Sequence, residues 1–286
     1  MPSTDQSLDL LRQDIDSIDI AIHDLIVKRG TIVEDIRKIK QGAGPALRPG
    51  REAMIMRRLA DRHRGRFPLQ ALFCLWREML GGFTNMQEPF SAAVHAPPGH
   101  DRLVRAARNH YGGMVPLNTF ATASACVRAV VERNAHIAVL PLPADGEIES
   151  WWPLLMSNDE KTPKVVARLP FLFEEGAEGA LVIAPWARDL SPSEASLIAL
   201  RLSERTSRGR IMGAIAAAGF VEALSLATIE TEQSDCLHVI EVDGAVQHDD
   251  PRVAALRIQF GGPLIDAHII GGYARPMVPA TGPNRT

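Results

Sequence analysis

The chain has 286 residues, 46% of them hydrophobic, and its length predicts two or three globular domains with a sizeable core. Its formal charge of −3 gives no electrostatic basis for a nucleic-acid partner. It has no apolar run of about eighteen residues and no signal-peptide pattern, so we expect no membrane partner and a cytoplasmic location. The three cysteines lie far apart and no residues have metal-ligand spacing, so we predict neither disulfides nor a metal site.

The first predicted element is a long helix from Leu8 to Lys40. Its apolar residues recur at steps of three and four, which indicates one stripe of a helix. The stripe consists of Leu8, Leu11, Ile15, Ile18, Ile22, Leu25, Ile32, Ile36 and Ile39. At about 1.5 Å per residue this rod is about 50 Å long, longer than a small domain is wide. We therefore expect a second copy of the chain to cover the stripe, in a homodimer formed through this helix.

Three cations on this helix are candidate binding residues, namely Arg12, Arg29 and Lys40. At about 100° per residue, Arg29 and Lys40 lie only about 20° apart around the helix axis, so both can reach one site. Arg12 lies about 100° from Arg29 and would contribute to the equivalent site of a partner chain. The alternative is that all three belong to the solvated face of an amphipathic helix.

Two more helices are predicted, over residues 51–64 and from Leu69 to about Gln87. The polar residues come in a distinctive order: LRxxIDxID, a lone Arg, IxxIK, a loop, the pair RE, and a last helix with LWRE followed by Gln. This order resembles the all-helical chorismate mutase domain. The resemblance covers about residues 5–88 and implies an intertwined dimer of three-helix chains, which we assign to residues 1–90.

The resemblance implies an enzyme that rearranges chorismate to prephenate by a pericyclic shift, with no cofactor, nucleophile or metal. Chorismate is a dianion, and arginine side chains bind carboxylates with two hydrogen bonds at a time. By position, Arg29 and Arg51 would bind these carboxylates, and Arg12 would contribute across the dimer interface.

The remaining implied roles concern the ring hydroxyl and the ether oxygen of the substrate. Lys40 and Gln87 would donate to the ether oxygen, where negative charge builds as the C–O bond breaks. Glu52 would accept a hydrogen bond from the ring hydroxyl. Lys40, Gln87 and Arg29 are therefore the expected catalytic residues.

Two positions depart from the family pattern: Arg48-Pro49-Gly50 replaces a segment that often carries an acid, and Phe83 stands where Ser is common.

The middle of the chain has an α/β rhythm. Residues 86–100 are rich in Pro, Ala and Gly and are predicted to be a linker. Helices are predicted over residues 101–112 and 121–134, and the apolar run 136–143 predicts a buried strand. The pair Trp151-Trp152 is expected to form half-buried anchors.

This middle part resembles a prephenate dehydratase domain, through PPGHDRLVRAARNHYG and NAHIAVLPLPADGEIESWWPLL. The polar groups that the dehydration needs are replaced, by His100, by Pro143-Ala144 and by Glu178-Gly179-Ala180 before the apolar LVIA. We therefore interpret residues 91–186 as a degenerate dehydratase-like α/β lobe.

The last third begins with the N-cap signal Ser191-Pro192-Ser193-Glu194, which predicts a helix. The pattern after it predicts a helix, two strands, a helix and a strand, over residues 210–220, 223–231, 236–244, 250–260 and 266–273.

This order resembles the βαββαβ fold of the ligand-sensing ACT domain, which we assign to residues 187–286. The effector motifs of that family are largely replaced, by Gly209-Arg210-Ile211 and by Glu230-Thr231-Glu232-Gln233. Gly271-Gly272 is expected to allow a close approach of two backbones rather than to bind phosphate.

The predicted fold is thus multidomain, α plus α/β, and three functions stay open. The first is a chorismate mutase of aromatic amino acid biosynthesis with a vestigial second lobe. The second is a bifunctional mutase and dehydratase. The third is a non-catalytic regulatory subunit, in which the first helix only joins two chains.

Overall fold

A computed structural model describes residues 4–40, 44–147, 149–173, 176, 179–186, 189–231 and 234–278. The chain divides into two compact units. The first comprises residues 1–46 and 83–89, and the second comprises residues 47–82 and 90–286. In the described part of the chain, no helix is both long and apolar enough to cross a membrane.

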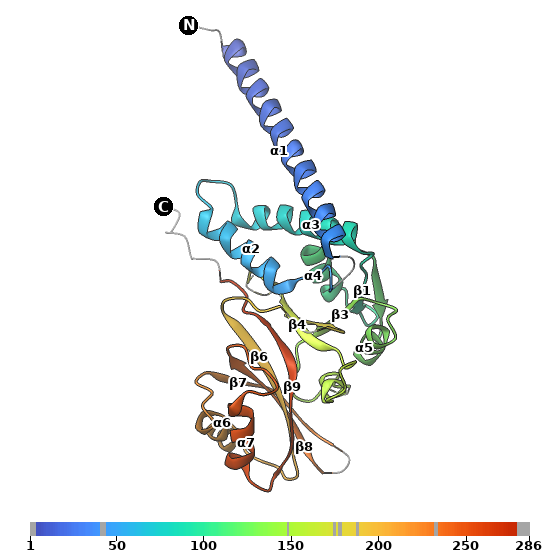
Figure 1. The fold of residues 1–286 in the computed structure, drawn as a ribbon, viewed down its shortest axis with the longest axis vertical. Helices are drawn as coiled ribbons and strands as arrows, with labels where there is room; N and C mark the ends of the chain where they lie inside the picture. The colour runs from blue at the N-terminus through green and yellow to red at the C-terminus, as the bar shows by residue number, and fades with distance from the viewer. Residues whose placement is uncertain are drawn as a thin grey trace. The chain divides into compact units, whose positions relative to one another are not determined.

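The element order is helical at first and mixed afterwards (Figure 1). The α-helices are α1 (Thr4–Lys40), α2 (Pro49–Arg62), α3 (Leu69–Gln87), α4 (Arg102–Tyr111), α5 (Ala123–Val131), α6 (Arg208–Ala217) and α7 (Pro251–Phe260), and η1 (Trp152–Leu155) is a 3₁₀ turn. The strands are β1 (Ala92–His95), β2 (Leu117–Phe120), β3 (Ile137–Pro141), β4 (Lys164–Leu169), β5 (Ala180–Ala184), β6 (Glu194–Leu202), β7 (Ala223–Glu230), β8 (Cys236–Asp243) and β9 (Leu264–Ala274).

The predicted long helix is confirmed as α1, which has 37 residues and is about 55 Å long. Its apolar stripe is exposed from end to end, with Leu25 at 65% and Ile39 at 81% exposure. The described residues of the chain therefore leave this stripe uncovered.

Helices α2 and α3 are also confirmed, and within the second unit α2 is attached to the α/β part by polar contacts. The carboxylate of Asp189 accepts hydrogen bonds from the backbone N–H groups of Gly50 (3.0 Å) and Arg51 (2.9 Å), which satisfies the free N–H groups at the start of α2. Arg57 donates to the backbone oxygens of Pro192 (2.7 Å) and Arg275 (2.9 Å). An apolar cluster adds to this attachment. It contains Ala53, Met56, Phe73, Leu80, Phe171 and Leu172.

The strands form one sheet in the order β2-β1-β3-β5-β4-β9-β6-β8-β7. Strands β2, β1 and β3 are parallel, and alternate residues of β1 face opposite cores. Ala92 and Val94 pack with Leu103 of α4, whereas Ala93 packs with Val127 of α5. This half of the sheet is thus covered on both faces, as expected for an α/β layer.

Strand β1 corrects the prediction of a linker over residues 86–100. Its four residues, AAVH, are too short to show a period of two, and small residues such as alanine do not signal a strand. The pairing of β1 with β2 on one side and β3 on the other makes it a buried strand. Strands β2 and β4 were also not predicted, although the adjacent valines of β4, Val165 and Val166, favour a strand.

The C-terminal part has the βαββαβ order expected of an ACT-like domain, from β6 to β9, but its first strand stands where a helix was predicted. Strands β9, β6, β8 and β7 are antiparallel neighbours. Helices α6 and α7 lie side by side on this sheet and bury Ile211, Ile215, Leu256 and Phe260 against it (Figure 1). The predicted domain boundaries after residues 90 and 186 stay predictions.

The helix predicted after Ser191 is wrong, because this segment forms the central strand β6. The N-cap signal is real as a local contact, since Glu194 Oε1 accepts hydrogen bonds from the backbone N–H (2.7 Å) and the hydroxyl (2.6 Å) of Ser191. The contact closes a turn, however, and Ser193 has a φ of +62°. Strand β6 lies between β8 and β9 and is almost entirely buried, so its apolar run carries no clear period.

Trp151 and Trp152 are fully buried, at 1% and 0% exposure, and this corrects the prediction of half-buried anchors. The indole Nε1 of Trp151 donates to the backbone oxygen of Pro141 at 3.1 Å. Both rings belong to the core that α5 shares with β6 and β8. The two halves of the sheet therefore share one hydrophobic core that contains both tryptophans.

Gly271 allows the two halves of the sheet to meet, as expected from the sequence. Strand β4 pairs with β9 only at Val165 and Gly271, where Gly271 has a φ of +128°. A Cβ atom at this position would lie 2.3 Å from the backbone nitrogen of Val165. A side chain would thus collide with backbone that cannot move aside.

We predict that Gly271→Ala lowers the free energy of unfolding by about 2 kcal/mol or more, through this collision and the strained φ. Urea unfolding followed by tryptophan fluorescence measures this free energy of unfolding. Gly262→Ala is the matched control, because a Cβ there meets nothing within 4 Å. Equal unfolding midpoints for the two variants would contradict the prediction.

Candidate active site

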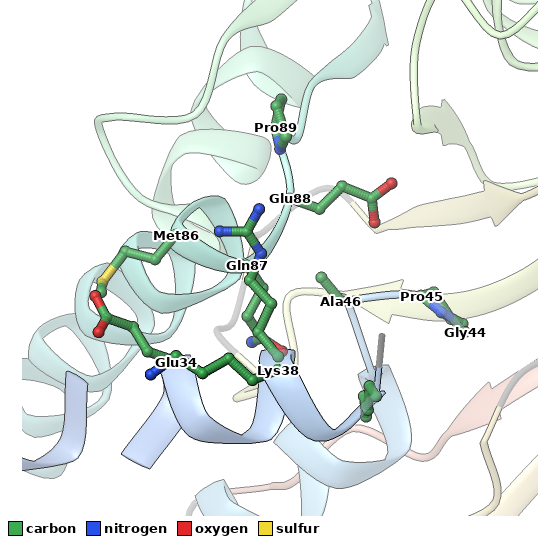
Figure 2. Close-up of a pocket in the computed structure, with 11 residues that line it drawn as sticks. Glu34, Lys38, Gly44, Pro45, Ala46, Met86, Gln87, Glu88 and Pro89 are labelled. Atoms are coloured by element: carbon green, nitrogen blue, oxygen red, sulfur yellow. The ribbon is translucent and has the colours of Figure 1, made fainter. Parts of the chain in front are cut away.

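A cavity of about 570 Å³ lies in the first unit, between the last turns of α1 and the end of α3. Figure 2 shows Glu34 and Lys38 of α1 and Met86 and Gln87 of α3 around it. The polar side chains that line the cavity are Glu34, Arg37, Lys38, Lys40, Gln87 and Glu88. Its volume suits a small organic molecule.

Lys40 and Gln87, two of the predicted residues, line this cavity together. Each is half-buried, Lys40 in the last turn of α1 and Gln87 at the last residue of α3. The side-chain amide of Gln87 donates to the backbone oxygen of Phe83 at 3.3 Å, a contact within its own helix. An ammonium and a carboxamide are therefore among the hydrogen-bond donors that line the cavity.

Arg29 lies three turns before Lys40 on α1 and stacks on an aromatic ring. Its guanidinium carbon is 4.4 Å from the ring centroid of Phe83, which is buried. A cation over a ring at this distance is attracted to the π face, so Phe83 restrains the position of the guanidinium. This contact gives Phe83, noted above as a departure from the family pattern, a physical role.

Arg12 lies far from this cavity along α1. Its side chain is 72% exposed and forms an ion pair with Asp9 at 3.0 Å. Among the predicted residues of the first unit, Lys40 and Gln87 line the cavity, whereas Arg12 and Arg29 do not.

Arg51 and Glu52 belong to the second unit. The side chain of Arg51 is exposed, and its backbone N–H is bound by Asp189. Glu52 is buried, and its Oε2 accepts a hydrogen bond from Nη1 of buried Arg77 at 2.7 Å. Burial raises the pKa of Glu52 despite the attraction of Arg77, and burial likewise lowers the pKa of Arg77.

This ion pair is a feature that the sequence did not reveal. Arg77 is the Arg of the LWRE motif, which was used only to recognise the last helix. A buried charge is tolerated when a partner compensates it, so Glu52 and Arg77 depend on each other in the folded chain.

Sequence reasoning also missed Arg37, which lines the cavity together with Lys40. The signal was present, because residues three apart on a helix lie on the same face. Lys38, next to it, forms an ion pair with Asp35 at 3.1 Å. Within the described ranges, no cluster of His, Cys, Asp and Glu could hold a metal ion.

The structure describes some of the residues that stand where the dehydratase and ACT families have their motifs. His100 is exposed, and its Nδ1 lies 3.2 Å from the backbone oxygen of Pro98. Glu230, retained from the ACT signature, forms an exposed ion pair with Arg205 at 3.5 Å. Glu178, Glu232 and Gln233 lie outside the described residues.

Comparison with known proteins finds a family match in the helical part of the chain. Residues 11–88 match the family model of chorismate mutase type II. The bifunctional chorismate mutase/prephenate dehydratase of Neisseria gonorrhoeae is 30% identical over 136 residues, which are 48% of this chain and 37% of that protein. The chain thus carries an N-terminal chorismate mutase type II domain and spans well under half the length of the curated relative.

Two solved structures are similar at lower identity. GqqA, described as a novel type of quorum quenching acylase, is 18% identical and is matched over 64% of this chain and 94% of its own, with a TM-score of 0.46. A prephenate dehydratase from Streptococcus mutans is 17% identical over 65% of this chain and 98% of its own, with a TM-score of 0.41. At these TM-scores, neither likeness bears on the function of this chain.

Proposed function

We propose that this chain is a chorismate mutase, which rearranges chorismate to prephenate in aromatic amino acid biosynthesis. The observation that carries the proposal is the match of residues 11–88 to chorismate mutase type II, in a chain where Lys40 and Gln87 line one cavity. A pericyclic shift requires a folded substrate conformer and donors at the ether oxygen, and this cavity offers donors of that kind.

In the proposed mechanism, fixed donors stabilise charge that develops in the transition state. The ammonium of Lys40 and the carboxamide of Gln87 donate to the ether oxygen, which gains negative charge as the C–O bond breaks. Arg29, restrained by Phe83, and Arg51 bind the carboxylates of the substrate. Because Arg77 holds Oε2 of Glu52, we propose that Oε1 accepts the hydrogen bond of the ring hydroxyl.

The active form is proposed to be a cytoplasmic homodimer built on α1. The exposed stripe of α1 supports a dimer, because an uncovered helix of this length gains most of its stability from packing. Arg12 lies outside the cavity of its own chain and would reach the site that the partner forms. The reaction requires no cofactor.

Two alternatives differ in their products. A bifunctional mutase and dehydratase is favoured by the two activities in the name of the Neisseria gonorrhoeae relative, whose likeness extends over more residues than the mutase family match. A non-catalytic regulatory subunit would use α1 only to join two chains.

One assay separates the three functions. Purified protein is incubated with chorismate, the loss of chorismate absorbance is followed, and the products are separated. Accumulation of prephenate supports the proposal, and phenylpyruvate supports the bifunctional alternative. An unchanged chorismate concentration would refute the mutase activity.

We predict that Arg12→Ala and Lys40→Ala, each nearly inactive alone, recover activity when the two variants are mixed and allowed to exchange subunits. In a mixed dimer, one of the two sites would keep both Arg12 and Lys40, so activity should approach about a quarter of the wild-type value if subunits pair at random. Mixtures that stay inactive, although mass spectrometry shows mixed dimers, would contradict a site shared between chains.

A further inference from the structure

A second cavity, of about 480 Å³, lies entirely within the second unit, between α3 and α4. From α3 it is lined by Gln70, Phe73, Cys74 and Arg77, at the steps of three and four that define one helix face. From α4 it is lined by Arg102, Arg105 and Asn109. Ala106 and His110 of α4 and, after β4, Pro170, Phe171, Leu172 and Gly176 also line it. We call this cavity the α3–α4 groove.

Among the described residues that line the groove, the charged side chains are arginines. Its lining contains three arginines and two side-chain amides, and none of the described residues that line it is Asp or Glu. Arg77 is compensated by Glu52, and in the described part of the chain Arg105 forms an exposed ion pair with Asp101 at 3.4 Å. Exposed pairs of this kind are weak, so Arg105 keeps most of its capacity to bind another anion.

The inner part of the groove is aromatic. Phe73 and Phe171 are both buried, and the guanidinium carbon of Arg77 lies 5.6 Å from the ring centroid of Phe171. Aromatic rings and guanidinium planes are surfaces on which a flat ring can stack. Arg102 and Arg105 are exposed on α4. The groove thus combines an apolar inner part with a cationic rim.

We propose that the α3–α4 groove binds a flat-ring carboxylate, with its ring against Phe73 and Phe171 and its carboxylate on Arg102 and Arg105. Guanidinium groups match a carboxylate with paired, charge-assisted hydrogen bonds, which favours this class over neutral ligands. The volume of the groove lies within the range of small-molecule sites. This inference goes beyond the proposed mutase function, because none of the four side chains has a role in that mechanism.

Cys74 provides a reporter inside the groove. It is the exposed cysteine of the chain, whereas Cys126 and Cys236 are buried. The first experiment compares how fast Cys74 reacts with 5,5′-dithiobis(2-nitrobenzoate), an aromatic disulfide that carries two ring carboxylates, and with neutral 4,4′-dithiodipyridine. We expect the double variant Arg102→Gln/Arg105→Gln to react about tenfold more slowly with the anionic reagent and at the wild-type rate with the neutral one.

The matched control is Arg128→Gln, which removes one exposed arginine on α5, outside the groove. It should react with both reagents as the wild type does. If the double variant keeps the wild-type rate with the anionic reagent, the arginines do not attract ring carboxylates and the proposal is overturned. A double variant that slows equally with both reagents has changed the exposure of Cys74, which also counts against the proposal.

The second experiment uses benzoate as the ligand and the neutral reagent as the probe. Benzoate should protect Cys74 in a saturable manner, its neutral analogue benzamide should not, and the double variant should lose the protection. Equal protection by benzamide, or none by benzoate, would refute a carboxylate site. Chorismate turnover of the double variant should stay at the wild-type value, so failure here is distinguishable from failure of the mutase proposal.

Discussion

Replacing Lys40 with alanine is expected to lower kcat about 100- to 1000-fold. One fixed donor at a developing oxyanion contributes about 3–4 kcal/mol to the stabilisation of a transition state, and each 1.4 kcal/mol corresponds to about a tenfold change in rate. In the proposed site Lys40 is the charged donor to the ether oxygen, and Gln87 offers only a neutral amide. Initial rates of chorismate loss at saturating substrate measure the effect.

The matched control for this variant is Lys28→Ala, which removes an exposed lysine of the same helix that does not line the cavity. Its kcat should stay close to the wild-type value. Circular dichroism of both variants establishes that α1 is intact. If Lys40→Ala and Lys28→Ala have the same kcat, Lys40 has no role in the transition state.

Replacing Glu52 with alanine is expected to destabilise the second unit by about 3–5 kcal/mol. Removal of one partner from a buried ion pair leaves the other charge without compensation, here the guanidinium of Arg77. Urea unfolding followed by tryptophan fluorescence reports on this unit, because the buried Trp151 and Trp152 belong to it.

The double variant Glu52→Leu/Arg77→Met tests the cause of this loss. It removes both charges and keeps apolar volume, so it should recover much of the lost stability. Glu204→Ala is the control, since it breaks the exposed pair with Arg210 in the same unit and should hardly change the unfolding midpoint. If Glu52→Ala unfolds like the wild type, the ion pair with Arg77 does not support the fold.

The helices were the most predictable part of the fold. In α1 the period of the apolar residues is repeated over many turns, and in α2 and α3 it is bounded by Pro-rich or Gly-rich segments. The strands were less predictable. Strand β1 has four residues and gains its identity from two neighbouring strands, while β6 is buried on both faces and shows no alternation. A local sequence pattern carries no information about which strands will pair with a segment in the folded chain.

The candidate site, too, could be predicted from the sequence only in part. The geometry of a helix places Arg29 and Lys40 on one side of α1 without any knowledge of the rest of the chain. The sequence could not indicate that Phe83 would stack on Arg29 or that Arg77 would hold Glu52. Each of these contacts joins residues of different helices.

The amino-acid sequence alone predicted the long amphipathic helix and the placement of its cations, because these features recur at intervals set by the helix itself. It also showed the resemblance of residues 5–88, which rests on the order of their polar residues. Folding decided which cations share a cavity, which carboxylate is buried against an arginine, and which short apolar segments become central strands. The reason is physical: burial, ion pairing and strand pairing depend on distances between segments that are remote in the chain, and those distances exist only in the folded molecule.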